Sequence, residues 1–281
     1  LGHDIDGVAK GRLRKLTLAT QISVSSGQIK LTGIKLHFDS SRLTGGVTIA
    51  LRKRPSFGAR ITVDKINLDA YLPNQKKETF TKKSIANLAN VEDGKKSSSA
   101  ISKKQNPFQS LKFLNELDAN LMVRVKSLTL REGLIKNAVF DGTLYNGNLD
   151  IRRFGADRIN NSTVFVEGKV SNFGGVLKAS ALSFKAKTEG VNGLFQLAGL
   201  SGVQALKGLG AVQANGQIDG SILAPTVKLN LASSGVQVKV FGQLDGLALV
   251  PAVKKLTVQI EVKNASKLLR LAGINAVSAR Q

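Results

Sequence analysis

Apolar and polar residues alternate along most of this chain. The clearest run is residues 117–126, with apolar side chains at 117, 119, 121, 123 and 125 and mostly polar or charged residues between them. Successive side chains of a β-strand point to opposite faces, so this alternation predicts a strand with one apolar and one polar face. The same alternation recurs at 149–151, 164–166, 227–231, 236–240 and 258–262.

Turn signals between these runs predict how the strands connect. Asp141-Gly142 and Asn146-Gly147 are dipeptides typical of two-residue hairpin turns. All five prolines fall between the alternating runs, where a missing backbone N–H disturbs no strand pairing. The pattern therefore predicts an all-β fold with about 13 meandering antiparallel strands and short helices.

Three regions differ in composition. Residues 1–72 are predicted to be a strand set that ends in a helical turn, and 107–281 the main β-meander, with helices near 107–117, 191–207 and 265–272. Residues 73–106 are rich in lysine and serine and offer little to bury, so they are predicted to be a basic, mobile linker. Because a strand–cap–apolar-helix element recurs at 184–200 and 260–274, we expect stacked repeat units and one continuous β structure across the linker.

The net charge of +22 requires an account, although no single segment is a basic tail. Lysines spread over polar strand faces keep sheets soluble, and they also attract anionic partners. We expect diffuse contact with an anionic membrane surface through the lysines of the polar face. These candidates for headgroup contact are Lys126, Lys178, Lys185, Lys187, Lys228 and Lys239.

Residues that carry chemistry are scarce. The chain has no cysteine, and its two histidines, His3 and His37, are remote in sequence. No phosphate-binding loop, dinucleotide fingerprint or serine-nucleophile motif is present. We therefore expect neither enzyme activity, nor a metal site, nor a cofactor. Nucleic-acid binding is the alternative that the charge suggests, and the sequence disfavours it because Phe165, Phe184 and Phe241 stand isolated instead of forming a stacking platform.

One run resembles a known family. Residues 54–73 end in Leu68-Asp-Ala-Tyr-Leu-Pro73, and the linker, the 117–126 strand, the 147–151 hairpin and the 191–200 segment follow in order. This order and this motif resemble the AsmA family, whose members are envelope proteins of Gram-negative bacteria and are similar to bridge-like lipid-transfer proteins. The resemblance implies a fragment of a periplasmic protein anchored in the inner membrane, whose curved, partly open sheet forms a trough for phospholipid acyl chains. Its partners would be phospholipids and the remainder of the parent envelope protein.

The apolar face is therefore the candidate site. The small aliphatic residues expected to line it are Val123, Val125, Val164, Val166, Val238, Val240, Val258 and Ile260. None offers a polar group that would select a particular small molecule. Alternation by itself is compatible with two interpretations. The apolar face could be an open trough for acyl chains, or it could be the closed core of a structural β-domain without a ligand.

Overall fold

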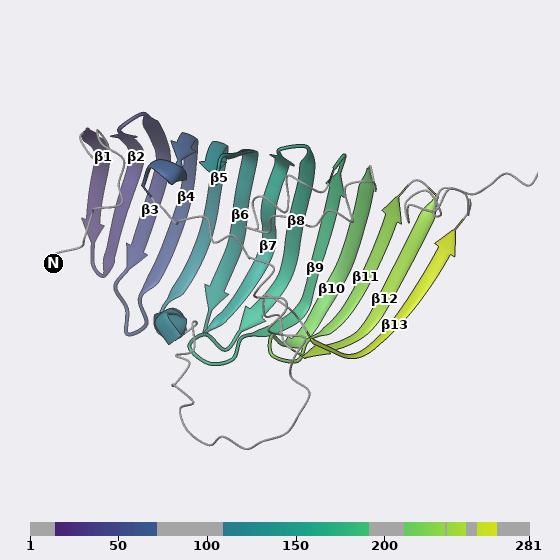
Figure 1. The fold of residues 1–281 in the computed structure, drawn as a ribbon. Coiled ribbons are helices and arrows are strands. Elements are labelled where there is room, and N and C mark those ends of the chain that lie inside the picture. The colour runs from purple at the N-terminus through teal and green to yellow at the C-terminus, as the bar shows by residue number, and fades with distance from the viewer. Residues whose placement is uncertain (1–14, 72–108, 191–210, 234, 246–251, 263–281) are drawn as a thin grey trace, which may run out of the picture.

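The fold is a single β-sheet of 13 strands in a computed structural model (Figure 1). The structure describes residues 15–71, 109–190, 211–233, 235–245 and 252–262. Within these ranges, the all-β fold and the strand number predicted from the sequence are confirmed.

The strands are long, at 8–13 residues each. The first four are β1 (Leu16–Ser25), β2 (Gln28–Phe38), β3 (Ser41–Ala50) and β4 (Ser56–Asn67). The central five are β5 (Asp118–Leu130), β6 (Gly133–Tyr145), β7 (Asn148–Ile159), β8 (Ser162–Ser171) and β9 (Lys178–Thr188). The last four are β10 (Val212–Ser221), β11 (Thr226–Ser233), β12 (Val236–Asp245) and β13 (Ala252–Val262).

The strands lie in the sheet in the order in which they occur in the chain. Every neighbouring pair is antiparallel except β4 and β5, which pair in parallel from Ser56–Asp118 to Asn67–Thr129. The expectation of an entirely antiparallel meander is wrong at this pair. To pair in parallel with β4, the chain must return to the end of the sheet at which β4 begins before β5 starts. The long connection between the two strands allows this return. The sheet is curved and does not close, because β1 and β13 do not pair with each other.

The Leu68-Asp-Ala-Tyr motif ties this crossover to two turns. It forms the 3-10 helix η1 (Leu68–Ala70), capped by the Asn67 side chain, which accepts from the Asp69 N–H. The Asp69 carboxylate accepts from the backbone N–H groups of Arg131 and Glu132, the left-handed turn residues between β5 and β6. Tyr71 donates its hydroxyl to Asp39, in the β2–β3 turn, at 2.8 Å. These residues therefore have a structural role at the end of the sheet where the β2–β3 and β5–β6 turns lie.

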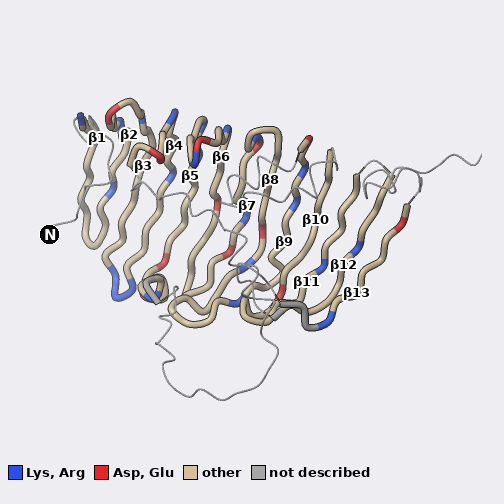
Figure 2. Tube along the Cα trace, in the orientation of Figure 1, with Lys and Arg blue, Asp and Glu red and all other residues tan. Residues whose placement is uncertain are grey.

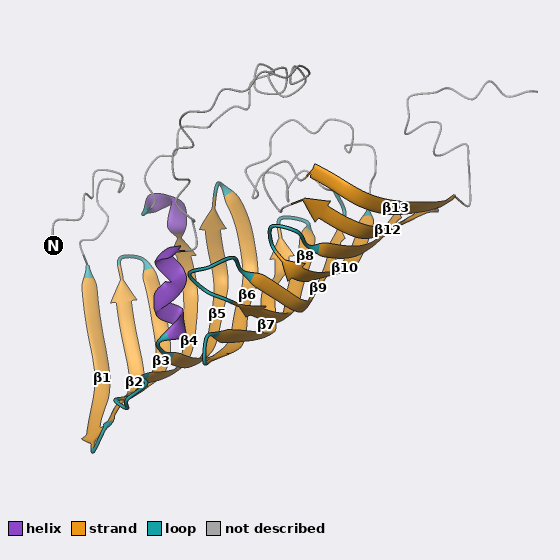
Figure 3. Cartoon of the chain, turned by 90° about the horizontal axis from the view of Figure 1, so that it is seen from below, coloured by secondary structure: helices purple, strands orange, loops and turns teal. Residues whose placement is uncertain are grey.

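A second 3-10 helix, η2 (Gln109–Asn115), packs on the sheet at the other end of the central strands. It lies within the helix predicted for 107–117. Figure 3 shows both helices on the same side of the sheet. The buried residues Ala119, Leu144 and Phe173 form a small core cluster beneath η2. Apolar residues of η2 and of the neighbouring strands pack against this cluster: Phe57, Leu111, Leu114, Leu117, Leu121, Leu149, Val170 and Leu177.

The two glycine dipeptides behave differently. Asn146-Gly147 is the β6–β7 turn, with φ of 48° and 70°, as predicted. Asp141-Gly142 lies inside β6, where the register to β7 shifts, so the predicted turn is wrong there. A Cβ at Gly142 would lie 3.0 Å from the Phe140 ring, and glycine leaves room for that ring instead of making a turn.

The 73–106 linker and the predicted helices near 191–207 and 265–272 lie outside the described residues. The β4–β5 pairing joins the strands before and after the linker into one sheet.

Candidate functional site

One face of the sheet is apolar on every strand. Side chains of directly paired residues point to the same face, so the register can be followed from β1 to β13 as rows. The first row, one residue per strand, reads Leu18, Leu36, Leu43, Val63, Val125, Ala138, Ala156, Val164, Ala186, Ala214, Leu231, Val238 and Ile260.

Two more rows run beside it, nearer to η2. The second spans β2–β13 and reads Ile34, Gly45, Ile61, Val123, Phe140, Phe154, Val166, Phe184, Gly216, Leu229, Val240 and Val258. The third, interrupted by a register shift between β8 and β9, reads Ile22, Leu31, Val47, Ala59, Leu121, Gly142, Ile151 and Gly168, then Leu182, Ile218, Val227, Gly242 and Leu256. Every position in these rows is aliphatic, phenylalanine or glycine. We call the three rows the apolar face.

All eight residues predicted to line the site lie on this face. Val125, Val164, Val238 and Ile260 belong to the first row, and Val123, Val166, Val240 and Val258 to the second. The structure brings them together across the β5–β13 part of the sheet.

The sequence reasoning missed two groups of residues. The first is on β1–β4, where the same rows continue through Leu18, Leu36 and Leu43; their alternation was visible, but their place on the face depends on register. The second is the aromatic part of the second row. Phe140 and Phe154 meet edge to face, with ring centroids 6.3 Å apart, and Phe184 lies two strands further along.

The apolar face is open along most of its area. Phe154 sits on the central strand β7, yet its side chain is 53% exposed. Towards the two sides, Leu18 on β1 is 61% exposed and Ile260 on β13 also 61%. Apart from Pro225, only eight apolar residues of the described part are buried, and three of them form the cluster under η2. The described residues therefore form a small core under η2, at one end of the central strands, and leave a much larger apolar surface open.

The opposite face of the sheet is polar, and the candidate lysines lie there. Lys185 and Lys239 belong to a row that pairs through Asn215 and Asn230. All six candidate lysines are exposed, and Figure 2 shows basic residues spread over the strands instead of gathered in one patch. On this face, Arg153 lies 4.1 Å from the ring centre of Phe165, and Lys228 lies 5.8 Å from that of Phe241. The sheet separates these cations from anything held on the apolar face.

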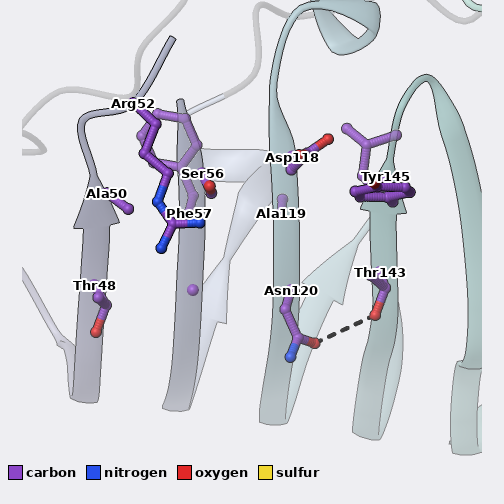
Figure 4. Close-up of a pocket in the computed structure, with 12 residues that line it drawn as sticks. Thr48, Ala50, Arg52, Ser56, Phe57, Asp118, Ala119, Asn120, Thr143 and Tyr145 are labelled. Atoms are coloured by element: carbon purple, nitrogen blue, oxygen red, sulfur yellow. Dashed lines mark hydrogen bonds between the residues drawn. The ribbon is translucent and has the colours of Figure 1, made fainter. Parts of the chain in front are cut away.

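A shallow hollow of about 280 Å³ opens at the edge of the polar face (Figure 4). Thr48, Asn120 and Thr143 line its floor, and the Thr143 hydroxyl lies 3.5 Å from the Asn120 side-chain oxygen. In the adjoining hollow, Arg152 donates to Asp141, to the Thr143 hydroxyl and to Asn120. Both hollows lie on the other side of the sheet from the three rows.

One ionic contact fixes the edge beside η2. The Asp118 carboxylate accepts from the backbone N–H of Asn146 at 3.0 Å and from Arg54 Nε at 2.6 Å. Arg54 also donates to the Leu117 carbonyl at 3.0 Å. The hydrogen bond from Asn146, followed by the one from Arg54, lowers the pKa of Asp118 below its ordinary value. These bonds join the β3–β4 and β6–β7 turns to the start of β5.

The site thus belongs to an open β-sheet with one continuous apolar face. Comparison with models of protein families, with curated proteins and with solved structures finds no match. In the ranges that the structure describes, no helix has the length and apolar character needed to span a bilayer. Within the same ranges, histidine and acidic side chains nowhere gather in a group that could hold a metal ion.

Proposed function

We propose that the apolar face holds phospholipid acyl chains, and that the protein takes part in phospholipid transport and outer-membrane biogenesis. In this proposal it works in the periplasm, as part of an AsmA-like envelope protein anchored in the inner membrane. The lipid-binding step is carried by one observation: the first row is apolar on all 13 strands without interruption. The cellular setting is supported by the resemblance of residues 54–73 to the AsmA family.

The dimensions of the face suit acyl chains. With strands about 4.8 Å apart, 13 strands extend over roughly 60 Å. Along a strand, the distance from Val125 to Ala119 is six residues, or about 20 Å. One leaflet contributes about half of the roughly 30 Å hydrocarbon core of a bilayer, so an acyl chain fits within the depth of the face.

The chemistry of the face suits flexible apolar chains. No side chain in the three rows can donate or accept a hydrogen bond, so the face has no means of selecting a polar ligand. Acyl chains need only the removal of apolar surface from water, worth roughly 25 cal/mol per Å² buried. An exposed Phe154 in the middle of the sheet is the kind of surface that gains most from such cover.

The two alternatives have less support. A closed structural core requires a second layer over the rows. In the described part of the chain only the two short 3-10 helices and their neighbouring residues lie over the face, η2 at one end of the strands and η1 at the other. Nucleic-acid binding requires a platform of neighbouring exposed aromatic rings on the basic face. There, Phe241 is 52% exposed, but it lies four strands away from Phe165, and each ring lies beside a cation of the protein itself, Lys228 or Arg153.

The test is photo-crosslinking with purified protein. A photoreactive residue is placed at Val166 or Val240 on the apolar face and, as the matched control, at Lys239 on the polar face. Mass spectrometry then identifies what is captured from phospholipid vesicles. We expect phospholipid adducts at positions 166 and 240 and few at 239. Absence of lipid at both apolar positions, in protein that is still folded, would falsify the proposal.

A further inference from the structure

The β1 edge of the sheet lacks the features that usually protect an edge strand. β1 is ten residues long and contains no charged residue and no proline. Within the described part of the chain it pairs with β2 only, so one side of its backbone has no strand partner there. Lysines, prolines or very short strands normally prevent such an edge from pairing with another chain.

The apolar side chains of β1 are also strongly exposed. Leu16, Leu18, Ile22 and Val24 are 61–73% exposed. Leu18 belongs to the first row and Ile22 to the third, so the apolar face extends to this edge of the described sheet. The opposite edge differs, because β13 carries Lys255 and Glu261.

The sequence of β1 is complementary to itself. If two copies pair in antiparallel fashion about Thr20, residue 18 lies opposite residue 22 of the second copy, and residue 16 opposite residue 24. Leu18 then meets Ile22, and Leu16 meets Val24, so each of these four apolar residues finds an apolar partner. The two-fold axis is perpendicular to the sheet, so both apolar faces lie on the same side.

We propose that this protein forms a two-fold dimer by antiparallel pairing of β1 with β1 of a second copy. The dimer is one continuous sheet whose apolar face is twice as long as that of a single chain. The new interactions are backbone hydrogen bonds and apolar contacts, and both copies carry a net charge of +22. Salt screens that repulsion, so the dimer becomes tighter as salt rises.

The test uses Thr17 and Ser23, which lie on the polar face and oppose each other across the proposed pair. In the variant T17E/S23E, two glutamates face each other at both ends of β1, which weakens the dimer about tenfold. In T17K/S23E, each glutamate faces a lysine, and dimerisation returns. The glutamate introduced at position 23 lies beside Lys30 of β2 in both variants, so the two differ only at position 17.

Sedimentation equilibrium of the full chain, over a range of protein and salt concentrations, gives the dissociation constant of each variant. Circular dichroism confirms that each variant is folded. The lipid content is measured in parallel and should be unchanged, because neither substitution lies on the apolar face. We expect a wild-type dimer that strengthens with salt, a weakened T17E/S23E and a restored T17K/S23E. A wild-type monomer at all concentrations, equal dimerisation of both variants, or open-ended oligomers formed by β1 and β13 overturns the proposal.

Discussion

Phe184 of β9 lies across Gly216 of β10, with ring atoms 2.7–2.9 Å from the point where a Cβ of residue 216 would be. The Lys228 carbonyl oxygen is 2.5 Å from the same point. The two residues pair directly in the second row of the apolar face. Glycine is thus required at 216 by the close approach of a ring and of a neighbouring strand.

Replacing Gly216 by alanine should displace the Phe184 ring and push β10 away from β11. We expect a loss of about 1–3 kcal/mol in the free energy of unfolding, as for other overpacked positions. Gly58→Ala is the matched control, because a Cβ at that strand position meets only Thr48, at 3.9 Å. Urea unfolding curves measure both, and equal stability of the two variants contradicts this account.

An acidic residue on the apolar face should expel lipid. Val240 is half-buried near the β13 side of the sheet and does not belong to the core cluster under η2. We therefore expect Val240→Asp to stay folded and to lose most co-purifying phospholipid. Gln237→Asp places the same charge on the polar face of the same strand and should retain its lipid. Lipid extraction followed by mass spectrometry compares the two.

Val166→Asp should behave differently from Val240→Asp. Val166 lies between Phe154 and Phe184 in the second row, so the carboxylate of the introduced aspartate would lie beside two aromatic rings. We expect a loss of at least about 2 kcal/mol in unfolding free energy, in addition to loss of lipid. Equal stability of the two aspartate variants would show that the centre of the face is as wet as its side.

Asp69 should stabilise the β5–β6 turn through its two hydrogen bonds to backbone N–H groups, of 2.5 and 2.9 Å. Asp69→Ala leaves these two groups to water in a turn whose residues have positive φ, and we expect a cost of about 1–2 kcal/mol. Tyr71→Phe is the milder comparison. It removes one hydrogen bond to Asp39 but keeps the ring stacked on Phe38, with centroids 5.3 Å apart. That loss should cost about 1 kcal/mol, and urea unfolding curves of both variants measure the difference.

Asp118 predicts a specific pH dependence. Its pKa is lowered in the folded protein, first by the Asn146 hydrogen bond and then by the bond from Arg54. The stabilisation is therefore fully present above the pKa of the unfolded chain, about 4, and is lost as pH falls through the lower folded pKa. Asp118→Asn should be less stable than wild type at pH 7, and the difference should shrink below about pH 4. Urea midpoints at neutral and acidic pH measure it, and a constant difference would contradict the assignment.

The polar-face lysines should bind anionic membranes weakly and in a salt-dependent manner. We expect Lys185→Glu with Lys239→Glu to reduce flotation with phosphatidylglycerol vesicles, by roughly 1 kcal/mol per lysine at low salt. Raising the salt concentration should remove the difference, because exposed charges are screened beyond about 10 Å at 0.1 M. Lipid held on the apolar face should be unchanged, and equal binding to neutral vesicles would count against the lysines.

The sequence predicted the strands and the membership of the apolar face because both depend on local alternation. Residues two apart on a strand share a face whatever the neighbouring strand does, so pairs such as Val123 and Val125 were placed together correctly. The sequence could not predict the parallel pairing of β4 with β5. No local pattern determines the direction in which the chain re-enters the sheet after a long connection. The turn expected at Gly142 was wrong for a similar reason. A Cβ there would lie 3.0 Å from the Asp150 carbonyl oxygen of β7, and this close approach appears only once β6 and β7 are aligned.

The structural role of the Leu68-Asp-Ala-Tyr motif was also invisible in the sequence. Asp69 acts on the β5–β6 turn, far along the chain, and Tyr71 on the earlier β2–β3 turn. The open face is a further case, since alternation is the same whether or not a second layer covers it.

The parallel β4–β5 pair divides the folding of the sheet into two stages. On either side of it, the described strands β1–β4 and β5–β9 pair with their immediate neighbours in the chain, mostly across short turns, and such contacts form fast. Pairing Ser56 with Asp118 closes a loop of about 60 residues, which costs about 2 kcal/mol more than closing a five-residue turn. The two halves should therefore form first and meet last at this junction. Under mechanical load or mild denaturant, the same junction is where the sheet should first come apart.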